Sequence, residues 1–159
     1  MLKHPFIVIA LILLDLIISS YKKTNRYTDK HNQRQTNKLY LDIFPIFTSY
    51  IINNSIRKKE LVLSTKKIIL EHFDEKTSQK IMNSLKEYNQ NGVTNSDLQK
   101  ACFLCAYSTD FQSRIILLNI LEDIINSAEG NPTQAEANAF EKIANNLGVQ
   151  FNQSYQSNE

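Results

Sequence analysis

Two cysteines have the spacing found in metal knuckles and thiol redox motifs. They form the segment Cys102-Phe-Leu-Cys105, and the sequence holds two cysteines in all. A metal site of this kind needs a second Cys or His pair, which the sequence does not provide at a suitable distance. A redox motif needs a helix N-terminus to lower the thiolate pKa, whereas both cysteines fall mid-helix on an apolar stripe. We therefore expect buried, reduced core cysteines.

No pattern of residues indicates catalysis. The three histidines, His4, His31 and His72, are isolated in the sequence and suggest no ligand set. The sequence also has no recognisable serine–histidine–acid arrangement, phosphate-binding glycine loop or hydrolase carboxylate pair. A formal net charge of +2 gives little overall attraction to nucleic acid. We therefore predict neither an enzyme nor a nucleic-acid-binding protein, and we name no catalytic residue.

An acidic turn separates the last two expected helices. Glu129 and Glu136 lie on either side of this turn, and both can point into the loop. We expect Asn131 to cap the following helix, Pro132 to take its first position and Gln134 to complete a capping box. The turn and its two helices are the best-defined local structure in the sequence.

The last helix has a clear buried face and a clear end. Its apolar residues recur at i, i+3, i+4 and i+7, which places them on one side of a helix. They are Phe140, Ile143, Ala144 and Leu147. Gly148 supplies the left-handed stop, and Val149 is the apolar residue that usually follows such a stop.

The remaining apolar spacing predicts an all-α bundle over residues 39–151. Glycine and proline are scarce, at three each, and no long run alternates with period two. The first two expected helices cover 39–53, with an interruption near Pro45, and 58–73. The third is capped by Asp74 or Thr77 and ended by Gly92. The fourth is opened by Thr94-x-x-Asp97 and the fifth by the capping box Thr109-x-x-Gln112. This fifth helix is apolar around most of its circumference, so we expect it to be central and most buried.

Residues 1–21 are expected to form a transmembrane anchor. The segment Pro5–Tyr21 is apolar apart from Asp15 and its terminal serines. As a helix it would rise about 25 Å, slightly less than a hydrocarbon core of about 30 Å. The alternative is a cleaved signal peptide, in which case the helical domain would be exported. That alternative is weakened because Lys3 is the only early charge and no A-x-A site follows.

Residues 22–38 are expected to be a basic tether beside the membrane. They hold six Lys and Arg residues, whereas only Lys3 precedes the apolar span, and Asp29 is the only acid among them. The positive-inside rule then places the N-terminus outside and the rest of the chain in the cytoplasm. Such a tether can also contact anionic headgroups of the bilayer. Residues 152–159 read as a polar tail.

The acidic turn resembles that of the TerB fold, found in tellurite-resistance proteins and in the DjlA-type membrane co-chaperones. The family pattern is D-G-x-aliphatic-x-x-x-E between two helices, followed by a helix that ends near L-G-aliphatic. Here Gly130, Glu136 and Leu147-Gly148-Val149 match, while Glu129 replaces the aspartate and Pro132 the aliphatic residue. The anchor, tether and helical domain also resemble the DjlA-type arrangement, but no J-domain follows in this sequence.

The family is an internal duplication, and a second, altered copy of its motif is present. The segment Asn53-Asn54-Ser55-Ile56-Arg57-Lys58-Lys59-Glu60 fits the same frame and keeps Ile56 and Glu60. Asparagine replaces both the aspartate and the glycine. The resemblance therefore implies a pseudo-duplicated helical bundle over about residues 39–151.

The resemblance further implies a site for a divalent cation such as calcium. Hard cations take several oxygen ligands, with carboxylates dominating the charge. Glu129 and Glu136 would supply two carboxylates, Glu60 a third if the two loops meet, and Asn53 a neutral oxygen. The neighbouring lysines of the first loop oppose cation binding. The alternative is that Glu136 serves only the N-terminus of its own helix.

Taken together, the sequence predicts a single-pass bacterial inner-membrane protein with a cytoplasmic TerB-like domain. That domain would bind an unidentified protein partner in an envelope-stress or metal-stress response. A divalent-cation sensor built on the acidic turn, or an exported helical domain, are the alternatives.

Overall fold

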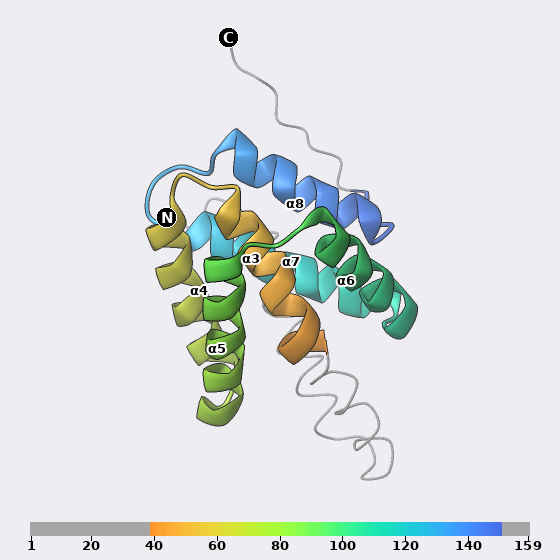
Figure 1. Cartoon of the computed structure of the whole chain (residues 1–159), viewed down its shortest axis with the longest axis horizontal. Coiled ribbons are helices and arrows are strands. Elements are labelled where there is room, and N and C mark those ends of the chain that lie inside the picture. The colour runs from red at the N-terminus through yellow and green to blue at the C-terminus, as the bar shows by residue number, and fades with distance from the viewer. Residues whose placement is uncertain (1–38, 151–159) are drawn as a thin grey trace.

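The computed structural model describes residues 39–150, and all regular structure in this part of the chain is helical (Figure 1). A π-helical turn, η1, covers Leu39–Ile43 and leads into the α-helices. These are α3 Phe44–Asn53, α4 Lys58–His72, α5 Glu75–Asn91, α6 Asn95–Ser108, α7 Phe111–Ser127 and α8 Gln134–Asn146. The predicted all-α class is confirmed for these residues.

The predicted anchor, tether and tail lie outside the described residues. Among the helices at 39–150, none is long and apolar enough to cross a membrane. The membrane-spanning segment predicted at Pro5–Tyr21 therefore stays a prediction.

Helix α3, and not α7, is the element around which the domain packs. It contacts η1 and every other helix from α4 to α8, whereas α7 packs chiefly on α3, α4 and α8. Figure 1 shows α3 between the α4–α5 pair and α6. The prediction of a central fifth helix is therefore wrong. Phe44, Phe47 and Ile51 fill the centre from α3, while α7 begins at the exposed Phe111. The apolar circumference of α7 reflects partial burial on several sides.

The interruption predicted near Pro45 is present. The backbone is π-helical up to Ile43, and the α-helix starts at Phe44 with Pro45 in its first turn. A proline is accommodated there because the first N–H groups of a helix have no partner within it.

Two of the three predicted caps in the middle of the chain are correct. The Asp74 side chain accepts a hydrogen bond from the Thr77 amide at the start of α5. Thr94 and Asp97 form the predicted capping box of α6. Short-range sequence patterns were sufficient here because each cap involves residues three apart.

The capping box predicted for α7 at Thr109 and Gln112 is wrong. Asp110 caps α7 by accepting from the Ser113 amide at 2.7 Å. The Thr109 hydroxyl instead donates to the carbonyl of Cys105 in α6. Only Thr109 and Asp110 separate the two helices, so Thr109 serves the end of one and Asp110 the start of the other.

The cysteines are core residues, as expected. Cys102 and Cys105 are free and buried on the inner face of α6. Burial raises the pKa of the Cys102 thiol to about 12 and also raises that of Cys105. Both thiols are therefore protonated at neutral pH and poor nucleophiles.

The end of α8 also follows its prediction. Gly148 has a φ of 71°, and the Val149 amide donates to the carbonyl of Ala144 at 3.0 Å. These are the features of a Schellman cap. From α7, Arg114 Nη1 donates to the carbonyl of Leu147 at 2.9 Å and so joins the two helices.

Candidate functional site

The loop before α8 has a different cap from the one predicted. Thr133 is the N-cap, with its hydroxyl accepting from the Glu136 amide at 3.3 Å. In return, Glu136 Oε2 accepts from the Thr133 amide at 3.1 Å. The predicted roles of Asn131, Pro132 and Gln134 are therefore wrong. A carboxylate accepts a stronger hydrogen bond than an amide oxygen, which favours the Thr133–Glu136 box.

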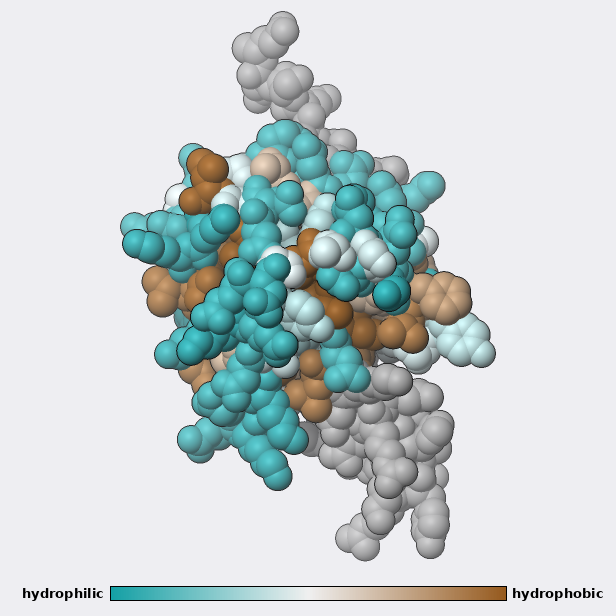
Figure 2. Space-filling view, viewed as in Figure 1, coloured by the Kyte–Doolittle hydropathy of each residue, from teal (hydrophilic) through white to brown (hydrophobic). Residues whose placement is uncertain are grey.

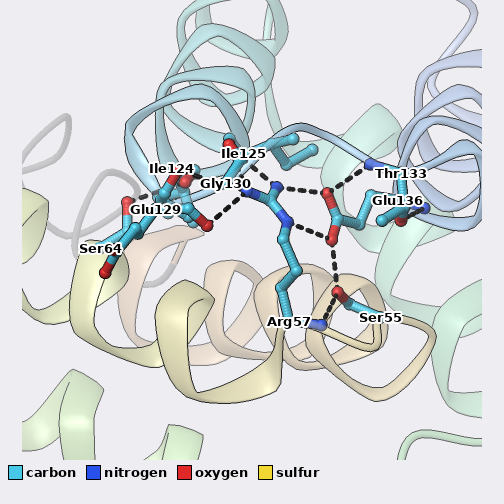
Figure 3. Close-up of polar contacts among 10 residues, drawn as sticks. Ser55, Arg57, Ser64, Ile124, Ile125, Glu129, Gly130, Thr133 and Glu136 are labelled. Atoms are coloured by element: carbon cyan, nitrogen blue, oxygen red, sulfur yellow. Dashed lines mark hydrogen bonds and ion pairs between the residues drawn. The ribbon is translucent and has the colours of Figure 1, made fainter.

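The Glu136 carboxylate forms a buried ion pair with Arg57 of the α3–α4 loop (Figure 3). Arg57 Nη2 lies 2.5 Å from Oε2, and Arg57 Nε donates to Oε1 at 3.0 Å. The Ser55 hydroxyl also donates to Oε1. The side chain of Glu136 is 0% exposed and that of Arg57 10%. Two parallel N–H···O bonds of this kind are the strongest geometry for an arginine–carboxylate pair.

The same guanidinium group holds the end of α7 and the loop that follows. Nη2 donates to the carbonyl of Ile125 at 3.1 Å, a group at the C-terminal end of the helix. Nη1 donates at 3.0–3.2 Å to three successive carbonyls, those of Ala128, Glu129 and Gly130. The last carbonyls of a helix need outside donors, and a positive charge is favourable there. Arg57 therefore satisfies both the carboxylate and the α7–α8 loop.

A second polar contact joins α4 to the end of α7. The Ser64 hydroxyl donates to the carbonyl of Ile124 at 2.8 Å (Figure 3). Ser64 follows Arg57 by seven residues, which is about two turns of helix. It adds to the attachment of the first loop region to the second.

The surroundings of Glu136 change its pKa in two opposed directions. Burial raises the pKa of the carboxyl group. Hydrogen bonds from Arg57, Ser55 and the Thr133 amide, with the charge of Arg57, lower it by more. The net pKa lies below the ordinary value of 4.5, so Glu136 is ionised at neutral pH.

The four residues predicted to bind a cation do not gather around one point. Glu136 is engaged by Arg57, and the exposed Glu129 contributes its backbone carbonyl to the same arginine. Glu60 is partly exposed, and the buried Asn53 amide nitrogen has no hydrogen-bond partner. Within residues 39–150, no three His, Cys, Asp or Glu side chains are placed to hold a metal ion. The predicted calcium-type site stays a prediction that the geometry does not favour.

Arg57 is the residue that the sequence reasoning missed. The two loops do meet, but a guanidinium group lies between them. One signal was present: the basic residue of this loop is an arginine, whereas the next two residues, Lys58 and Lys59, are lysines. Arginine is preferred over lysine where planar, two-pronged recognition of a carboxylate is needed.

A separate feature of the surface is a group of exposed apolar residues on α6 and the start of α7. Their side chains are between 47% and 84% exposed, and the rings of Phe103 and Tyr107 stack with centroids 6.1 Å apart. Figure 2 shows apolar residues projecting on the α6 side of the molecule. The group, called here the α6 aromatic patch, consists of Phe103, Leu104, Tyr107 and Phe111. Groups of exposed apolar residues of this kind can serve as interaction surfaces.

Comparison of the chain with protein-family models, with curated proteins and with solved structures finds no significant match.

The lowered pKa of Glu136 predicts a specific dependence of stability on pH. The charged form contributes stability above the ordinary pKa of 4.5, and this contribution is lost as the pH falls through the lower folded-state value. We therefore expect Glu136→Gln to be most destabilising near pH 7. The difference in melting temperature between the two proteins should shrink below about pH 4.5.

Thermal unfolding of both proteins from pH 7 to pH 3 measures this difference. Every other titrating group is common to the two proteins, so the difference isolates Glu136. A gap in melting temperature that stays constant down to pH 3 would contradict the charged ion pair.

Proposed function

We propose that this chain is a membrane-anchored, TerB-like protein-interaction module. The observation that carries the proposal is the α6 aromatic patch. Phe103, Tyr107 and Phe111 are exposed, and none of them belongs to the hydrophobic core of the domain. Large aromatic side chains supply most of the binding energy in protein interfaces. A patch of this kind on a helix is suited to receive an apolar surface of another protein.

The arrangement of the helices supports the TerB-like part of the proposal. The two motif copies, residues 53–60 and 129–136, make α3 equivalent to α7 and α4 equivalent to α8. Helix α4 packs on α7, and α8 packs on α3. Exchanging each helix for its equivalent converts one of these contacts into the other. A duplicated fold with approximate two-fold symmetry has this property.

The positions of the two glutamates support the same equivalence. Glu60 is the third residue of α4, and Glu136 is the third residue of α8. Each follows a loop that enters its helix from the preceding one. Arg57 stands at the N-cap of α4, where Thr133 stands in α8. The first copy thus supplies the guanidinium group of Arg57, which pairs with the Glu136 carboxylate of the second copy.

The cellular setting in the proposal comes from the sequence. The apolar segment Pro5–Tyr21 and the basic residues after it support a position of the domain on the cytoplasmic side of a bacterial inner membrane. The TerB resemblance suggests an envelope-stress or metal-stress response. A cation sensor is not favoured, because Arg57 already neutralises Glu136.

Photo-crosslinking in the native membrane tests the proposed binding role. The full chain would carry p-benzoylphenylalanine in place of Tyr107, or in place of the exposed Gln90 on α5 as a control. We expect an adduct of defined mass with a different protein at position 107 and none at position 90. Adding Phe103→Ser and Leu104→Ser should reduce its yield at least about tenfold, because aromatic anchors each contribute strongly to interfaces.

Two results would contradict this function. One is the absence of any adduct that distinguishes position 107 from position 90. The other is an adduct whose yield is unchanged by the serine substitutions. Circular dichroism of each variant verifies that the exposed substitutions leave the helical content intact.

A further inference from the structure

Two exposed aliphatic residues lie on α4, and a third lies in the loop just before it. They occur at every seventh position, and their side chains are between 56% and 89% exposed. Seven residues are close to two turns of an α-helix, so Leu63 and Leu70, which both belong to α4, lie on one side of it. Ile56 precedes the helix, and Leu63 and Leu70 lie within it. The opposite side of α4 enters the core through Leu61 and Ile69.

Lysines lie between these aliphatic residues. Lys59, Lys66 and Lys67 are exposed and stand three or four positions from Leu63 or Leu70. Residues at that spacing are neighbours on a helix surface. Lys58 adds a fourth positive charge at the start of the helix, while the acids of α4 are the partly exposed Glu60 and the exposed Glu71. This surface, called here the α4 outer face, is therefore both basic and regularly apolar.

The form of this surface favours a lipid layer over a protein as its partner. The apolar residues are separated by lysines, and the mixture of exposed aliphatic side chains and positive charges suits a layer of anionic lipid. Figure 2 shows separate apolar spots among hydrophilic residues on the α4 side of the molecule. At a lipid surface, leucines enter the boundary between headgroups and acyl chains, and lysines extend to the phosphates.

We propose that the α4 outer face docks on anionic phospholipid headgroups, with Ile56, Leu63 and Leu70 entering the interface. The inference goes beyond the proposed protein-binding role and uses a different surface. In Figure 1, α4 and α6 lie on opposite sides of α3, so docking through α4 leaves the α6 aromatic patch accessible. Docking through α4 would orient the domain on the membrane.

The test uses the full chain with a fluorophore attached at Leu63→Cys. Cys102 and Cys105 are buried, so a thiol reagent reacts selectively at the introduced site. A matched protein carries the fluorophore at Glu141→Cys, an exposed position on α8. Each protein is combined with phosphatidylcholine vesicles, with or without roughly one third phosphatidylglycerol, and brominated lipid acyl chains serve as the quencher.

We expect brominated lipid to quench the fluorophore at position 63 in anionic vesicles but not in pure phosphatidylcholine. The fluorophore at position 141 should be unaffected in both. Each basic residue near an anionic surface contributes roughly fivefold to binding. The triple variant Lys59→Gln/Lys66→Gln/Lys67→Gln should therefore weaken docking roughly 100-fold and remove the quenching.

Equal quenching at positions 63 and 141 would overturn the proposal, as would quenching that ignores the lysine substitutions. The proposal would also be overturned if anionic vesicles gave no quenching while polyglutamate protected the fluorophore at position 63 from solvent. That result would favour an acidic protein as the partner. Crosslinking at Tyr107 is read independently, so failure of lipid docking is distinguishable from failure of the proposed function.

Discussion

Arg57→Ala should lower the free energy of unfolding by about 3–5 kcal/mol, because it leaves the Glu136 carboxylate buried without its cation. The carbonyls of Ile125, Ala128 and Gly130 would lose their donor in the same step. For a domain of this size the melting temperature should fall by about 10–20 °C. Urea and thermal unfolding of the full chain measure both quantities.

A double-mutant cycle separates the ion pair from the carbonyl contacts. Glu136→Ala in the Arg57→Ala background removes the unpaired charge, so the double variant should cost less than the sum of the two single variants. Arg57→Lys retains the charge but not the two-pronged geometry, and we expect it to lose most of the stabilisation. Additive effects would contradict a direct interaction between the two residues.

Glu129→Gln is the matched control for these variants. The Glu129 side chain is exposed and contributes only its backbone carbonyl to Arg57. Its substitution should change the free energy of unfolding by no more than about 0.5 kcal/mol. A larger effect would mean that the carboxylate of Glu129 has a role in the loop that its backbone does not explain.

Phe47→Ala should lower the free energy of unfolding by about 3–5 kcal/mol, comparably to the loss of Arg57. Phe47 is 0% exposed and lies in α3, the helix that contacts all the others. Removing its ring opens a cavity that the surrounding helices can fill only partly. Chemical denaturation and loss of near-ultraviolet dichroism would report the change.

Phe111→Ala is the control, since it makes the same chemical change at a residue that is 52% exposed. We expect a loss of stability of about 1 kcal/mol, well below that of Phe47→Ala, because only about half of Phe111 is buried. If the two substitutions were equally destabilising, Phe111 would belong to the core and not to the α6 aromatic patch. The pair therefore tests the central position of α3 and the surface position of the patch together.

The local features of the fold were predictable from the sequence. The helices, the Thr94–Asp97 capping box, the Gly148 stop and the inward face of α8 all depend on residues within about one or two turns of each other. The burial of Cys102 and Cys105 followed from the same periodicity. At the start of α7 the sequence analysis chose Thr109 as the cap, whereas the structure uses the next residue, Asp110.

The candidate cation site shows the limit of the family resemblance. Placing Glu129, Glu136, Glu60 and Asn53 around one ion required the side chains of two loops to converge. The loops converge in the structure, but Arg57 is the group that joins them. A motif aligned by its acids does not indicate which neighbouring residue neutralises them.

The amphipathic helices of residues 39–150, and most of their ends, follow from local patterns in the chain, because hydrogen bonds between near neighbours control them. The central position of α3 and the contact between Arg57 and Glu136 depend instead on the packing of the helices. Periodicity reports how much of a helix is buried, but not against which helix. An ion pair between distant loops depends on how the helices pack, and so no local pattern specifies it.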